Sequence, residues 1–258
     1  MKPRFTWNGI AKWIAVLASA FALKHYYASA TADHLRWILA PTTACVEIVT
    51  GSSFEFESGA GYISEDRSFL IASSCAGVNF LITGFLMLSL RKLLRDRSKT
   101  IGWRFIPIAA VNAYVVTLVA NTARIAIALR TEWTEAGWLN PSQLHRFEGI
   151  FIYFAFLLLL SVLSESIRPE KTFDLFQKSF FPLLVYYATT LGVPLANGAY
   201  NRGTDFWEHS LFVLLIPFVI ILPIAVFQFC RSRFVRSETI HPRAWRLEEK
   251  RLRGFARR

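Results

Sequence analysis

The segment HSLFVLLIPFVIILPIAVFQFC, residues 209–230, contains no Lys, Arg, Asp or Glu and is apolar almost throughout. An α-helix rises ~1.5 Å per residue, so a helix of this length crosses the roughly 30 Å hydrocarbon core of a bilayer. The run is too long for the core helix of a soluble protein. It therefore predicts a membrane-spanning helix.

Five other segments have a comparable length and hydropathy, near residues 9–27, 69–92, 103–129, 149–168 and 180–200. With a composition that is 53% hydrophobic, they predict an all-α, polytopic helical bundle of about six transmembrane helices. This transmembrane domain is predicted over residues 1–230, and a basic tail over residues 231–258. The first segment contains Lys12 and Lys24, which can snorkel toward the headgroups. It also imitates a cleavable signal peptide, although Lys24 and His25 favour an uncleaved helix.

The charged residues predict how the bundle is oriented. Basic residues dominate the N-terminus, the connection after the second span and the tail, whereas residues 28–68 carry an excess of Asp and Glu. Since basic segments favour the cytoplasmic side, both termini are predicted to be cytoplasmic and residues 28–68 extracytoplasmic. Within 28–68, the stretch LRWILAPTTACVEIV (35–49) is too short to span and contains Pro41, so it predicts a re-entrant or interfacial segment.

The formal charge of +11 does not indicate a nucleic-acid partner. The basic residues form short clusters beside apolar runs, where they set topology and meet anionic lipid headgroups. The three cysteines show no CxxC motif and no paired Cys/His spacing, which argues against a zinc site and equally against a disulfide framework. The oligomeric state stays open.

Three polar residues within or beside the predicted spans are expected at the same outer level. Cys75 lies about two turns inside the second span, which begins on the outer side. Arg124 lies a similar distance from the outer end of the third span, and His145 shortly precedes the fourth. Residues separated by tens of positions are therefore predicted to converge on one leaflet.

Arg124 and Cys75 each have a structural and a functional interpretation. An arginine within a span costs ~2.5 to 3.5 kcal/mol on insertion scales, and it either snorkels or finds polar partners in the bundle interior. Asn121 precedes Arg124 by three residues and shares its face, which favours the interior. Cys75 is either a small buried hydrophobe or a nucleophile. Ser73 and Ser74 can cap a helix start there, and a thiolate is favoured near a helix N-terminus and a cation.

His145 is a candidate because Cys75 and Arg124 are predicted to lie at the same level. A Cys/His pair supplies a nucleophile and a proton shuttle, and an arginine can stabilise a tetrahedral oxyanion. Glu148 could orient the imidazole or could be an outer-surface charge, and the second interpretation is favoured. Gly77 leaves room for another backbone to approach, and Asn79 is a candidate supporting residue in the same stretch.

The motifs around these residues resemble a known family. They are Cys75-Ala76-Gly77 within CAGVNF, Asn121 to Ile125 (NTARI), and HRFEGIFIY from His145. They are similar to the Cys, Arg and His signature of the exosortase/archaeosortase family, most of all to the exosortase K type. The resemblance covers about residues 69–165. Many members of the family have Cys-Ser-Gly, and Ala76 departs from that pattern.

The resemblance implies a multi-pass inner-membrane cysteine protease or transpeptidase of Gram-negative bacteria that needs no cofactor or metal. Its substrates would be exported proteins with a C-terminal sorting signal of the PEP-CTERM kind: a Pro-Glu-Pro-type motif, an apolar helix and a basic cluster. Cys75 would form a thioester with the substrate at the periplasmic face. His145 would transfer protons, and Arg124 would stabilise the oxyanion or the thiolate.

A transporter or channel is the main alternative, with a polar path lined by Arg124 and Asn121. The polar residues crowd toward one leaflet and no inverted repeat is visible, which favours the enzyme. The sequence contains no GxSxG and no HExxH motif, so other protease chemistries have little support.

Overall fold

The computed structural model describes residues 7–95, 102–130, 141–165, 175–203, 206–228 and residue 230. It is mostly helical, at 81%. Among the described residues, five helical segments are long and apolar enough to cross a membrane: Ser73–Arg95, Phe105–Arg130, Gln143–Ser164, Lys178–Ala196 and Phe206–Gln228. The chain is therefore a helical bundle of multi-pass membrane character. The basic tail at 231–258 and the first six residues lie outside the described part.

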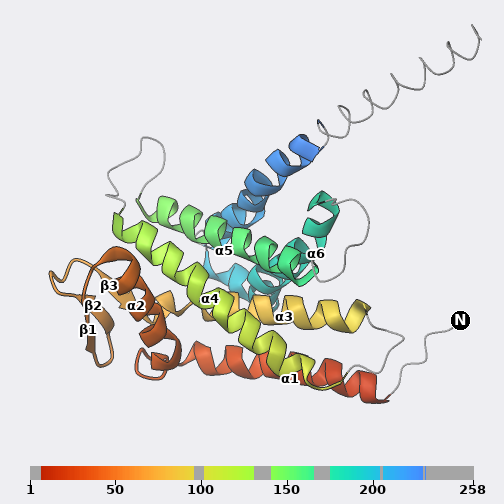
Figure 1. Cartoon of the computed structure of the whole chain (residues 1–258), viewed down its shortest axis with the longest axis horizontal. Coiled ribbons are helices and arrows are strands. Elements are labelled where there is room, and N and C mark those ends of the chain that lie inside the picture. The colour runs from red at the N-terminus through yellow and green to blue at the C-terminus, as the bar shows by residue number, and fades with distance from the viewer. Residues whose placement is uncertain are drawn as a thin grey trace, which may run out of the picture.

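Four long helices run side by side along the long axis of the molecule: α1 (Trp7–Ala28), α3 (Val78–Arg95), α4 (Phe105–Arg130) and α5 (Pro141–Glu165) (Figure 1). The predicted first span forms the helix α1, which packs against α3 but is not one of the five segments above. Lys12 of α1 is buried and lies over the Trp103 ring at 5.6 Å, so this side chain does not snorkel to solvent.

The predicted fifth span divides into shorter elements. They are α6 (Leu175–Tyr187), a π-helical turn (Ala188–Gly192), α7 (Val193–Ala196) and a 3₁₀ turn (Ala199–Arg202). Gly198 adopts a left-handed φ of 74°, and the helix ends at Ala196, before the predicted boundary. The Thr189 hydroxyl of the π-helical turn lies 2.9 Å from the Thr83 hydroxyl, which joins this turn to α3.

The helix α4 has an exposed face of large apolar side chains and a buried face of small ones. Large apolar side chains at three- to four-residue spacing are each more than half exposed: Ile108, Val111, Val115 and Val119. The buried face carries small side chains instead, such as Ala109, Ala113, Thr117 and Ala120. Small residues let neighbouring helices approach closely, and an exposed apolar stripe suits contact with lipid.

One end of the bundle carries α2 (Arg36–Thr50) and a three-stranded antiparallel sheet of β1 (Phe54–Glu57), β2 (Gly61–Ser64) and β3 (Leu70–Ala72) (Figure 1). α2 is the predicted short apolar segment. It packs against α4, where the Tyr114 hydroxyl donates to the Trp37 carbonyl at 2.8 Å. The sheet was not predicted, and its strand β3 occupies the first residues of the predicted second span, 69–92.

The turn between β2 and β3 provides a pH-dependent prediction. Asp66 accepts hydrogen bonds from the Ser64 and Ser68 hydroxyls at 2.6 and 2.7 Å, and these bonds lower the pKa of Asp66 from 3.8 to about 2. A lowered pKa contributes stability above the unfolded value, and this contribution is lost as the pH falls from about 3.8 to about 2.

We therefore expect Asp66→Asn to speed amide hydrogen exchange in residues 64–69 at pH 6, with the difference from the parent vanishing near pH 2. The exposed neighbour Glu65 provides the control, since Glu65→Gln removes none of these hydrogen bonds. A difference that is constant across this pH range would show that the Asp66 charge does not stabilise the turn.

Candidate active site

Cys75 lies in a short 3₁₀ turn, Ser73–Ala76, between β3 and α3. The prediction that it lies two turns inside a helix is wrong, because the chain is extended through Ala72 and Gly77 then takes a left-handed φ of 68° before α3 begins. Ser73 and Ser74 are inside the turn, which has no side-chain cap, so the predicted capping role is also not found.

Asn121 fixes the position of this turn. Its side chain is fully buried, and its Nδ2 donates to the Cys75 carbonyl. Its Oδ1 accepts a hydrogen bond from the Tyr153 hydroxyl at 2.8 Å. A single amide therefore joins the Cys75 turn, α4 and α5, and both of its polar ends are occupied. The Tyr153 ring stacks on Phe80 with centroids 4.9 Å apart.

Tyr153 was missed by the sequence reasoning, although a signal for it exists. His145, Gly149 and Tyr153 are spaced by four residues, which places all three on one face of α5. That face meets Asn121 and Arg124 of α4.

Arg124 points into the bundle, as the functional interpretation requires. Its guanidinium lies 5.6 Å from the centroid of the Tyr153 ring. It passes beside Gly149, where a Cβ would lie 3.7 Å from Nη1. The guanidinium interacts electrostatically with the side chains of Cys75, Glu148 and His145. Arg124 is thus the residue on which the other candidates converge.

His145 and Glu148 lie in α5, which begins earlier than predicted, at Pro141. His145 is therefore part of the helix and does not precede it. Its Nδ1 is 3.8 Å from Glu148 Oε2, and the Glu148 side chain is only 10% exposed. The prediction of an outer-surface charge at Glu148 is therefore wrong. Burial follows from the packing of α5 on α4, which brings Arg124 toward this carboxylate.

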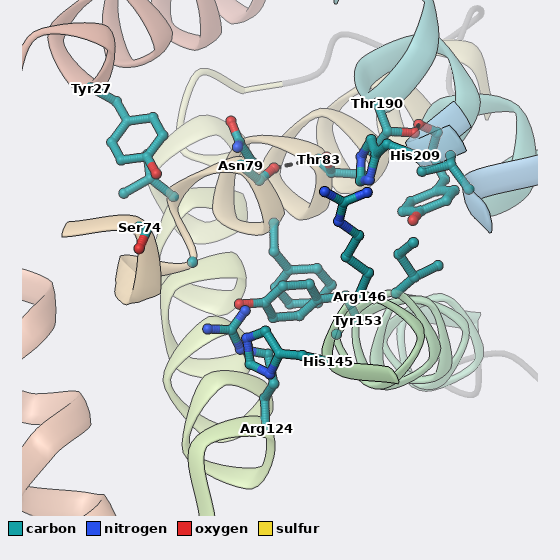
Figure 2. Close-up of a pocket in the computed structure, with 17 residues that line it drawn as sticks. Tyr27, Ser74, Asn79, Thr83, Arg124, His145, Arg146, Tyr153, Thr190 and His209 are labelled. Carbon is teal, nitrogen blue, oxygen red and sulfur yellow. Dashed lines mark hydrogen bonds between the residues drawn. The ribbon is translucent and has the colours of Figure 1, made fainter. Parts of the chain in front are cut away.

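A cavity of about 290 Å³ opens beside these residues. Arg124, His145 and Tyr153 line it, together with Ser74 and Gly77 on either side of Cys75 (Figure 2). The Cys75 side chain is half-buried, packs against the apolar core and is not one of the lining residues. The neighbours Ser74 and Gly77 line the cavity, whereas the Cys75 thiol does not.

Asn79 also lines the cavity, and its Oδ1 accepts a hydrogen bond from Lys24 Nζ at 2.7 Å. This bond joins α1 to the start of α3. Within the described residues, no group of three His, Cys, Asp or Glu side chains is placed to hold a metal ion.

Gly77 provides a stability prediction with a matched control. Its φ of 68° is unfavourable for other residues, and an added Cβ would lie 3.2 Å from Thr117 Cγ2 and 3.4 Å from Tyr153 Oη. Gly59 has a similar φ of 80° and nothing within 4 Å of a Cβ. Both alanine substitutions should cost about 1–2 kcal/mol for the left-handed conformation.

We expect Gly77→Ala to lower the thermal stability of the purified protein further than Gly59→Ala, because only Gly77 also faces crowding at the Cys75 turn. Equal losses in the two variants would mean that the turn adapts freely to the added methyl group. Thermal unfolding followed by tryptophan fluorescence in one detergent makes the comparison.

Comparison with protein-family models, with curated proteins and with solved structures finds no match to this chain.

Proposed function

We propose that the chain is a membrane-embedded cysteine peptidase or transpeptidase of the exosortase kind. The observation that supports this most is that the Cys75 turn, His145 and Glu148 all lie near the half-buried Arg124, beside a cavity. A nucleophile, a proton carrier and a fixed positive charge are the parts that acyl transfer through a thioester needs.

In the first half-reaction the Cys75 sulfur attacks a peptide carbonyl of the substrate, and the thiol proton passes to His145. The new C–S bond gives a tetrahedral oxyanion, whose charge is stabilised by Arg124. When the C–N bond breaks, His145 returns the proton to the leaving amine and a thioester remains on Cys75.

In the second half-reaction an acceptor amine or a water molecule gives up a proton to His145 and attacks the thioester. The C–S bond breaks, the oxyanion again collapses beside Arg124, and the thiolate regains the proton. Asn121 holds the Cys75 carbonyl throughout, so the sulfur starts from a fixed backbone.

The proposed substrates are exported proteins with a C-terminal sorting signal of the PEP-CTERM kind, and the proposed location is a bacterial inner membrane. The site then faces the periplasm, where the motif above a substrate's own transmembrane helix emerges. A polar transport path is less well supported, because both polar ends of the Asn121 amide are already bonded to Cys75 and Tyr153.

A labelling experiment tests the proposed placement of the thiol. In a variant that carries Cys45→Ser and Cys230→Ser, Cys75 is the remaining cysteine. We expect a membrane-impermeant maleimide to label it in spheroplasts, where only the periplasmic face is accessible. Labelling that occurs solely in inverted vesicles would place Cys75 on the cytoplasmic side and exclude the proposed function.

A further inference from the structure

The cavity extends beyond the proposed catalytic residues to a second group of polar side chains. Arg146 of α5 and His209 of the last described helix line this part, next to Thr190 of the π-helical turn. Figure 2 shows the Arg146 guanidinium extending toward His209, on the far side of the cavity from Ser74. The proposed mechanism uses none of these three residues.

The two formal charges among the lining residues, Arg124 and Arg146, are both positive. Of the 17 lining residues, all within the described part of the chain, two are arginines, two are histidines and none is Asp or Glu. Apolar side chains such as Ile150 and Val213 complete the wall. A cleft of one charge with apolar walls concentrates the field and favours a ligand of the opposite charge.

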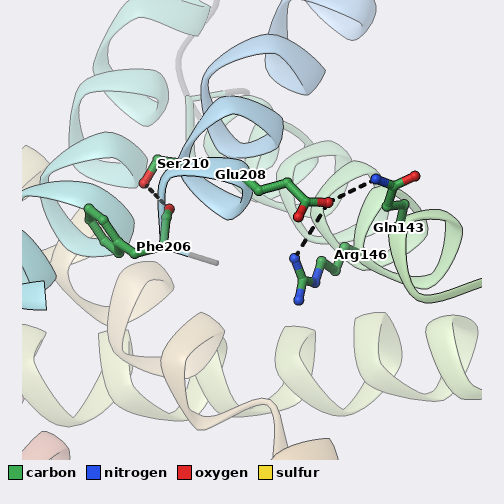
Figure 3. Close-up of polar contacts among 5 residues, drawn as sticks. All are labelled: Gln143, Arg146, Phe206, Glu208 and Ser210. Carbon is green, nitrogen blue, oxygen red and sulfur yellow. Dashed lines mark hydrogen bonds and ion pairs between the residues drawn. The ribbon is translucent and has the colours of Figure 1, made fainter. Parts of the chain in front are cut away.

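Glu208 lies beside Arg146 and is not one of the residues that line the cavity. Gln143 Nε2 donates to Glu208 Oε1 at 2.9 Å, and the same oxygen lies 3.9 Å from Arg146 Nη1 (Figure 3). This second distance is too long for a hydrogen bond, so this ion pair does not use the N–H donors of the guanidinium. The contact also joins α5 to the last described helix.

We propose that Arg146 and His209 form a carboxylate-binding subsite that reads an acidic side chain of the peptide substrate. A guanidinium can bind a carboxylate through two parallel N–H···O bonds, which gives both charge and directional selectivity. The subsite rests on the proposed function. It gives the last described helix and the π-helical turn a role in selecting substrates, apart from the chemistry at Cys75.

The test measures binding without turnover, using the full chain with Cys75→Ala in nanodiscs of phosphatidylcholine. Two synthetic peptides share one apolar helix and differ only in a Glu or a Gln in the short segment before it. We expect the Glu peptide to bind about tenfold more tightly, in line with a charge-assisted hydrogen bond. Arg146→Gln and His209→Asn should each reduce this preference to near onefold.

Arg104→Gln is the matched control, since Arg104 is exposed and precedes α4 outside the cavity. It should keep the full preference. Equal binding of the two peptides to the parent, no binding of either, or a preference that survives both cavity variants would overturn the subsite. Cleavage is measured separately with Cys75 present: a retained preference without cleavage would count against the thiol mechanism and leave the subsite standing.

Discussion

Replacing Cys75 with alanine is expected to abolish processing of proteins that carry the C-terminal sorting signal, with a loss of about 10⁴-fold or more. The thioester cannot form without the sulfur, and no neighbouring group replaces it in the proposed mechanism. Cys75→Ser should be nearly as inactive, because a hydroxyl is a far weaker nucleophile than a thiol at neutral pH. Immunoblots of an exported substrate, with and without its C-terminal segment, measure the effect.

The other two cysteines serve as controls for this experiment. Cys45→Ala and Cys230→Ala remove free cysteines that the proposed mechanism does not use, so both variants should process substrate at the parent rate. Membrane fractions must contain equal amounts of every variant. Normal processing by Cys75→Ala would eliminate the thiol mechanism. If the protein were a transporter, Cys75→Ala should leave its function intact.

Arg124→Gln is expected to lower the rate of processing by about 10² to 10³-fold, the range seen when an oxyanion-stabilising group is lost. Arg124→Lys should lose less, because it keeps the charge, but it cannot reproduce the planar guanidinium between Tyr153 and Gly149. Arg130→Gln, at the exposed end of the same helix, is the control and should process normally.

Loss of the Arg124 charge has a second consequence, because it removes a cation that interacts electrostatically with the largely buried Glu148 side chain. A carboxylate in a largely buried position is destabilised when a nearby positive charge is removed, and Glu148→Gln removes that cost together with the charge. Arg124→Gln should therefore be unstable, and the double variant Arg124→Gln/Glu148→Gln should regain thermal stability and remain inactive. Activity that returns together with stability would assign Arg124 a structural role.

The sequence predicted the helical bundle because each span is a long apolar run whose helical form is dictated by the bilayer. The sequence-based prediction was wrong for segments whose conformation the bilayer does not dictate. Residues 69–72 are apolar and were taken for the start of a span, yet residues 70–72 form the strand β3, which pairs with β2 at one edge of a sheet made from short local segments. Gly77 was singled out in the sequence because it leaves room for another backbone. In the structure, its positive φ ends the 3₁₀ turn that contains Cys75.

The residues of the candidate site were predictable to different degrees. Asn121 and Arg124 were found from their shared helical face. Glu148 was misjudged because its burial depends on how closely α5 packs against α4, and helical spacing does not reveal that. Tyr153 could have been found from its spacing to His145. His209 could not have been found in this way, because it lies 64 positions after His145 and reaches the cavity from a different helix.

The central claim is that Cys75 carries the substrate as a thioester, and mass spectrometry of acid-quenched enzyme during turnover tests it most directly. The account predicts that the proteolytic peptide containing Cys75 gains the mass of the substrate's N-terminal fragment, and that neutral hydroxylamine removes it. Substrate that is processed while Cys75 stays unmodified at every time point, or an adduct on a different residue, would contradict it.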